Sequence, residues 1–99
     1  MPLRSLVVAS ALIAATLSIA SAQQSARNTD RPGGDYDNFE IGIPDQCRAM
    51  CLKDRRCQAW TFVKPGIQGR RARCWLKDRV PQAVSNQCCT SGTRSVRID

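Results

Sequence analysis

The sequence contains no histidine among its 99 residues, and it lacks other groups that catalysis usually needs. General acid–base chemistry at neutral pH depends on histidine or on a carboxylate with a shifted pKa. The carboxylates here are scattered, mostly in expected turns, and no serine stands in a recognisable arrangement with a base. The phosphate-binding pattern G-x-x-x-x-G-K-[ST] is also absent. We therefore expect a protein that is not an enzyme and that uses no cofactor.

The six cysteines lack the spacing of a metal site. They follow the pattern C-x3-C-x5-C-x16-C-x13-CC, whereas zinc sites of this size usually show C-x2-C knuckles or paired histidines. A thioredoxin-type C-x2-C is missing as well. The pattern favours structural disulfides for four of the cysteines and predicts no metal site. These four are Cys47, Cys51, Cys57 and Cys74.

Only the N-terminus carries a long apolar run. Arg4 precedes an apolar stretch at residues 6–20, and Ala20-Ser21-Ala22 matches the A-x-A cleavage site of a secretory signal. Polar residues dilute the end of the run, which favours cleavage over a retained membrane anchor. We expect residues 1–22 to be a signal peptide and the protein to be secreted or periplasmic, where disulfides form and persist. After cleavage no membrane span is expected.

The remaining chain predicts one small α+β domain. Residues 23–34 are expected to form a polar lead-in, disordered over residues 23–30 and followed by a turn, with the domain at residues 35–99. We expect an edge strand at residues 36–41 and a helix at residues 46–53 with Asp45 as its N-cap. Strands follow at residues 57–64 and 71–77, joined by a hairpin loop. Residues 82–89 are expected to be a loop, and residues 92–98 a last strand.

The two central strands suggest a register. If Cys57 and Ala59 share a face with Cys74, period-2 alternation requires that the numbers of two residues lying opposite each other add up to an odd number. We predict Trp60 opposite Trp75, which gathers Trp60, Phe62 and Trp75 on the face away from the helix.

The residues also suggest a disulfide pairing. The short segment between Cys51 and Cys57 favours one bond between them, and Cys47 would then reach Cys74. Cys88 and Cys89 stay open: they can form a vicinal disulfide, bond to another chain, or displace a bond of the core.

Several motifs resemble the PAN/Apple domain family. The resemblance rests on residues 28–36 (NTDRPGGDY), residues 45–62 (DQC-x3-C-x5-CQAWTF), residues 74–77 (CWLK) and residues 88–92 (CCTSG). It implies a helix packed on a small antiparallel sheet, the pairs Cys47–Cys74 and Cys51–Cys57, and a role in binding proteins or carbohydrates. Many Apple domains also join their terminal strands by a disulfide, and this clamp cannot form here because no cysteine precedes Cys47.

Two features are candidate ligand sites. The formal net charge is +7, and basic residues cluster around the hairpin, which suits an anionic polymer such as an acidic glycan. The predicted aromatic face suits a protein or sugar ligand. Export argues against nucleic acid as a partner. The candidate ligand-binding residues are Arg70, Arg71, Arg73, Trp60 and Trp75, with Lys77 and Arg79 in the wider basic cluster.

Two alternative functions are also compatible with the sequence. A cationic defence or inhibitor peptide would use the loop at residues 66–73. A thiol redox protein would use Cys88 and Cys89.

Overall fold

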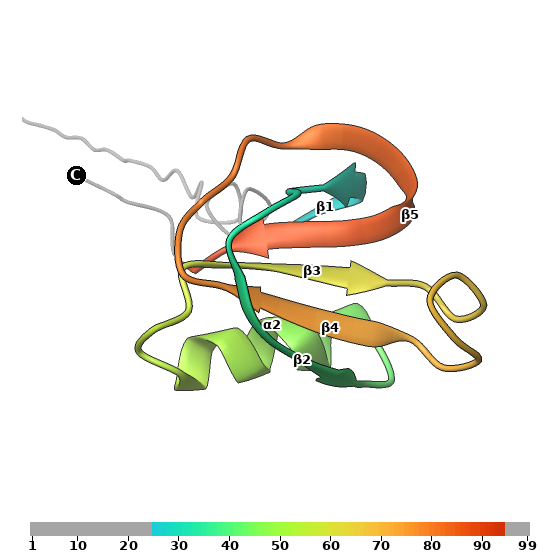
Figure 1. Cartoon of the computed structure of the whole chain (residues 1–99), viewed down its shortest axis with the longest axis horizontal. Coiled ribbons are helices and arrows are strands. Elements are labelled where there is room, and N and C mark those ends of the chain that lie inside the picture. Colours follow the sequence, from blue (N-terminus) through green and yellow to red (C-terminus); the bar gives the residue numbers. More distant parts are fainter. Residues whose placement is uncertain (1–24, 95–99) are drawn as a thin grey trace, which may run out of the picture.

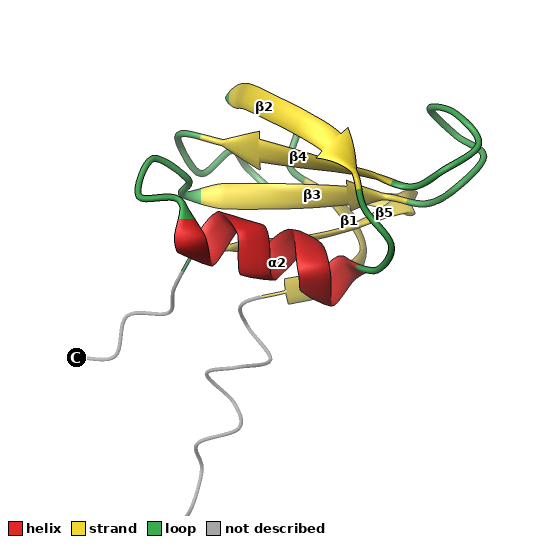
Figure 2. Ribbon diagram, turned by 90° about the horizontal axis from the view of Figure 1, so that it is seen from below, coloured by secondary structure: helices red, strands yellow, loops and turns green. Residues whose placement is uncertain are grey.

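One helix packs on a five-stranded antiparallel sheet in the computed structural model, which describes residues 25–94 (Figures 1 and 2). The strand order is β1-β5-β3-β4-β2. The elements in chain order are β1 (Ser25–Asp30), β2 (Asp35–Glu40), α2 (Pro44–Lys53), β3 (Ala59–Val63), β4 (Arg73–Lys77) and β5 (Val84–Thr93). The predicted α+β class is confirmed. The expected signal peptide, residues 1–22, lies outside the described residues, among which no helix is long and apolar enough to cross a membrane.

The helix α2 begins earlier than predicted. Pro44 occupies its first turn, where a proline costs no hydrogen bond. The predicted N-cap, Asp45, lies inside the first turn, where its negative charge suits the helix dipole. Ile43 is the N-cap instead, and the Gln46 side chain accepts hydrogen bonds from the backbone N–H groups of Gly42 and Ile43.

Disulfides attach α2 to the sheet. The buried residues of α2 are Cys47 and Cys51, both half-cystines. Cys47 is bonded to Cys74 in β4, and their Cα atoms are 5.4 Å apart. Cys51 is bonded to Cys57, which lies between α2 and β3, and their Cα atoms are 5.2 Å apart. Both pairings are as predicted. Met50 and Leu52 on the same helix are exposed, so they add little apolar packing between α2 and the sheet to the two disulfides.

The predicted register of the central hairpin is wrong by one residue. Trp60 lies opposite Leu76, and Thr61 lies opposite Trp75. The prediction assumed that Cys57 belongs to the strand and shares a face with Ala59. Cys57 instead lies in a turn, where its N–H donates to the carbonyl of Asp54, and β3 begins only at Ala59. The alternation of a strand therefore does not extend back to Cys57.

Two segments expected to be irregular form strands. Ser25–Asp30 of the predicted lead-in forms β1, and the predicted loop before Cys88 belongs to β5, which starts at Val84. These polar segments hold their places by pairing, because β5 lies between β1 and β3 and supplies partners to both. The β1–β5 ladder joins the two ends of the domain, where many Apple domains use a disulfide. Residues 95–98 of the expected last strand lie outside the described residues.

Arg94 closes the C-terminal end of the domain against the helix. Its Nη1 lies 3.1 Å from the carbonyl oxygen of Cys51, 2.8 Å from that of Asp54 and 3.0 Å from that of Cys57. The last carbonyl groups of a helix have no partner within the helix, and a cation here also suits the helix dipole. Arg94 therefore ties the end of β5 to the end of α2.

Candidate functional site

The two faces of the sheet have different compositions. Strand alternation and the observed register place Trp60, Phe62, Cys74 and Leu76 on the face covered by α2, where they form the core. The opposite face, here called the open face, carries Thr61 and Val63 from β3, Trp75 and Lys77 from β4, and Cys89 from β5.

Part of the open face is covered by the segment that links β1 to β2. These strands lie at opposite edges of the sheet, so residues 31–34 must cross one face, and Figure 1 shows them crossing the face away from α2. Beneath this segment is a cavity of about 420 Å³, within the range of about 300–1,000 Å³ typical of small-molecule sites. We call it the Trp75 cavity. Its lining residues are Asp30, Pro32, Gly33, Asp35, Thr61, Val63, Ile67, Gln68, Trp75, Lys77, Asn86, Cys88 and Cys89.

An ion pair between a buried lysine and an exposed aspartate holds the crossing segment at one end of the cavity. Lys77 is only 2% exposed, and its Nζ donates to the carboxylate of Asp35 at 2.6 Å and to the carbonyl of Gly33 at 3.1 Å. A buried ammonium is tolerated only when paired and hydrogen-bonded. Lys77 therefore belongs to the cavity and does not contribute to the basic surface with which the sequence grouped it.

The floor and one wall of the cavity are polar and aromatic. Thr61 is 2% exposed, and its Oγ1 has no hydrogen-bond partner in the described part of the chain. The indole N–H of Trp75 donates to Oε1 of Gln68 at 2.8 Å, which holds the partly exposed ring beside the cavity. Sequence reasoning missed Thr61 as a site residue, because only the correct register places it next to Trp75.

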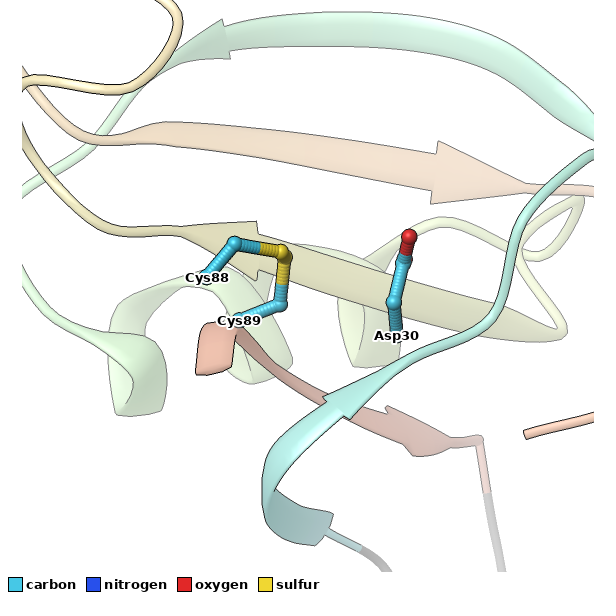
Figure 3. Close-up of side chains that lie close together, drawn as sticks. All are labelled: Asp30, Cys88 and Cys89. Atoms are coloured by element: carbon cyan, nitrogen blue, oxygen red, sulfur yellow. A yellow bond between two sulfur atoms is a disulfide. The ribbon is translucent and has the colours of Figure 1, made fainter. Parts of the chain in front are cut away.

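The opposite wall contains a vicinal disulfide. Cys88 and Cys89 are bonded to each other, which resolves the alternatives left open by the sequence. Figure 3 shows the carboxyl group of Asp30, from the end of β1, beside this disulfide on β5. The two sulfurs and a carboxylate oxygen of Asp30 lie within 4.8 Å of one another. Metals bind the thiolate form of cysteine, so the bonded sulfurs form a wall of the cavity and not a set of metal ligands.

The arginines of the predicted basic cluster lie around the end of the hairpin. Arg70 and Arg71 are exposed, and Arg71 lies 3.7 Å from the carboxylate of Glu40. Arg73 is on the open face, two residues from Trp75, and donates to the side-chain oxygen of Asn38. A surface ion pair such as Arg71–Glu40 is weak, at about 0–1 kcal/mol, so Arg71 can change partners readily.

Trp60 does not belong to the candidate site. It is 1% exposed and lies in the core beneath α2, on the face opposite Trp75. The expected pair of tryptophans on one surface is therefore wrong, and the cause is the register error described above. Trp75 is the tryptophan that borders the cavity.

Comparisons with known proteins agree with this architecture. The sequence pattern of the PAN domain matches residues 29–77, which run from the end of β1 to the end of β4. Strand β5 and its Cys88–Cys89 disulfide lie outside the matched segment.

A protein of Acanthamoeba polyphaga mimivirus, described only as uncharacterized, is 35% identical over 66 residues. The similar region covers 66% of this chain but only 18% of the viral protein, so the chain spans less than a fifth of that relative's length. PAN domains are generally modules that bind proteins or carbohydrates. With its helix attached by disulfides to an antiparallel sheet, the chain belongs to the PAN domain family.

Proposed function

We propose that this PAN domain is an exported, non-catalytic module that binds an acidic glycan through its open face. The observation that carries the proposal is the position of Trp75, in the wall of a cavity and two residues from Arg73 on the same face. An indole ring offers an apolar surface on which a sugar ring stacks. Guanidinium groups bind carboxylate and sulfate groups with two parallel hydrogen bonds.

The compartment supports this proposal. Six cysteines in three disulfides fit an extracellular protein, and such bonds persist only in an oxidising space. Glycans are abundant anionic polymers outside the cell membrane. The N-terminal sequence pattern of a secretory signal points to the same compartment.

Charge strengthens the case for an acidic ligand. The chain carries 15 lysines and arginines against 8 acidic residues. Such an excess of positive charge attracts anionic polymers over a distance and speeds their encounter with the protein. The exposed Arg70 and Arg71 extend the positive surface from Arg73 to the tip of the hairpin.

Retention on heparin-agarose in a salt gradient tests the proposal, with heparin as the acidic probe. Replacing Arg70, Arg71 and Arg73 together by glutamine should lower the salt concentration needed for elution, because exposed charges are screened by salt. The control variant replaces three other basic residues by glutamine and loses the same charge. These are the exposed Arg27 in β1, Lys53 at the end of α2 and Arg55 after it.

The two variants separate recognition from net charge. The hairpin variant should elute well before the control variant, and Trp75→Ala should also elute earlier although it loses no charge. Equal elution of both triple variants would show that heparin responds only to net charge, and the proposed site would be wrong.

A further inference from the structure

The Trp75 cavity contains polar groups that the fold itself leaves unpaired. Thr61 Oγ1 is buried without a hydrogen-bond partner among residues 25–94. The ammonium of Lys77 has three N–H donors and uses two, on Asp35 and Gly33. Buried polar groups are nearly always satisfied, by protein or by ordered water, and a ligand hydroxyl can take the place of such a water. These groups therefore indicate a ligand that can both donate and accept hydrogen bonds within the cavity.

Two walls of the cavity stand on opposite sides of β3. Strands β4 and β5 are the two neighbours of β3, so their backbones lie about 9.6 Å apart, at about 4.8 Å per strand. Trp75 lies on β4 level with Thr61, and Cys89 of the Cys88–Cys89 disulfide lies on β5 level with Val63, so the two walls are offset by two residues along β3, whose Thr61 and Val63 form the floor. A disulfide has no strong hydrogen-bond donor and behaves as an apolar surface. A flat ring with apolar faces and a polar edge matches this arrangement.

The charge inside the cavity differs from that of the hairpin surface. Two carboxylates, Asp30 and Asp35, face one ammonium, Lys77. The charged groups lining the cavity thus sum to one negative charge, which disfavours an acidic group inside it. Carboxylates are also good acceptors for hydroxyl donors.

We propose that the Trp75 cavity is a subsite for one uncharged sugar ring, held between the Trp75 indole and the Cys88–Cys89 disulfide. Hydroxyl groups of the sugar bond to Asp30, Thr61 and Lys77. Arg73 lies about 7 Å along β4 from Trp75, close enough to bind an acidic residue next to that ring in the same glycan. This inference rests on the proposed function and makes it more specific, because the ligand becomes a glycan with adjacent acidic and uncharged residues.

Matched monosaccharides test the subsite by NMR on the oxidised, isotope-labelled protein. The probes are D-glucose with D-glucuronic acid, D-galactose with D-galacturonic acid, and N-acetyl-D-glucosamine. At least one uncharged probe should shift the indole N–H signal of Trp75 and the amide signal of Thr61, while the buried Trp60 indole signal stays in place. The corresponding acid should bind more weakly.

Three variants probe the two walls and the floor. Trp75→Ala should abolish the shifts, whereas Trp75→Phe, which retains a ring, should keep part of the binding. Thr61→Val has the same shape without a hydroxyl and should weaken binding about two- to thirteenfold, the loss expected for one hydrogen bond of roughly 0.5–1.5 kcal/mol. Replacing both Cys88 and Cys89 by alanine should also weaken binding, with near-UV circular dichroism confirming the fold of each variant.

The outcomes separate this inference from the proposed function. If heparin retention depends on the hairpin arginines but no uncharged sugar shifts the Trp75 signal, the subsite is wrong and the acidic surface stands. If an uncharged sugar binds but heparin retention follows net charge alone, the cavity is confirmed and the acidic surface is wrong. Tighter binding of the acids than of the uncharged sugars would also overturn the subsite.

Discussion

The attachment of α2 to the sheet depends on sulfur, and removing the Cys47–Cys74 bond tests this directly. The buried side chains that α2 contributes to the core are Cys47 and Cys51. A helix of ten residues is unstable by itself in water, so packing on the sheet must maintain it. Replacing both Cys47 and Cys74 by alanine removes the one covalent bond between α2 and β4 in the described residues.

The expected loss is large for a domain of this size. Cys47 and Cys74 are 27 positions apart, and the entropy of closing such a loop in the unfolded chain corresponds to about 3.6 kcal/mol. Small domains have a total stability of only about 5–15 kcal/mol. Each kcal/mol shifts the Tm of a domain of this length by about 4–8 °C, so we expect a fall of roughly 15–30 °C.

Thermal unfolding followed by circular dichroism measures this loss, with the other disulfides as controls. The Cys51–Cys57 bond closes a much shorter loop, with a separation of 6, and should contribute only about 2.4 kcal/mol. The Cys88–Cys89 bond joins neighbours in the chain and should contribute least. The decrease in Tm should therefore follow the order Cys47–Cys74, Cys51–Cys57, Cys88–Cys89. A Cys47–Cys74 variant that keeps its helical signal and loses less than the Cys51–Cys57 variant would refute the reasoning.

Three further predictions concern side chains outside the candidate site. The hydrogen bond from Tyr36 to Asp54, at 2.6 Å, lowers the pKa of Asp54 below its usual 3.8, while burial and then this bond raise the pKa of Tyr36 above 10.0. The lowered pKa of Asp54 stabilises the fold above about pH 4, and the raised pKa of Tyr36 stabilises it below about pH 10. Outside this window the Tm of Tyr36→Phe should therefore fall less steeply with pH than that of the unsubstituted protein. Identical pH profiles of Tm for the two proteins would contradict this. Arg94→Ala should cost at least ~2 kcal/mol in urea unfolding, because its charged hydrogen bonds to three carbonyls are lost, and Arg94→Lys should recover only part of the loss. Trp60→Ala should lower the free energy of unfolding by about 3–5 kcal/mol, because it removes a buried ring from the core. Trp60→Phe should lower it much less, because phenylalanine keeps a ring and removes a buried Nε1 that has no partner in the described residues. A Trp60→Ala variant of normal stability would contradict the place of Trp60 in the core.

Local signals predicted the parts of the fold that depend on neighbouring residues. The i, i+4 spacing of Cys47 and Cys51 placed both sulfurs on one helix face, and the short segment to Cys57 favoured the observed bond. The β-branched and aromatic run before Lys64 predicted β3. By contrast, β1 and most of β5 consist of polar residues that carry no strand signal. These segments become strands because hydrogen bonds to each other and to β3 hold them in place, and such pairing between distant segments is not visible in the local sequence.

The amino-acid sequence by itself indicated the pairs Cys47–Cys74 and Cys51–Cys57, the approximate place of the helix and a family of binding modules, since these follow from spacing and motifs. It left the pairing of Cys88 and Cys89 open, and only the structure shows them bonded to each other. The tertiary structure alone decided which tryptophan meets solvent. A shift of one residue in the β3–β4 register moves every side chain of one strand to the other face, and the register itself depends on the loop that joins the two strands. The cavity, too, exists only after folding, because β1 and β2 occupy opposite edges of the sheet and the chain between them must cross the face that carries Trp75.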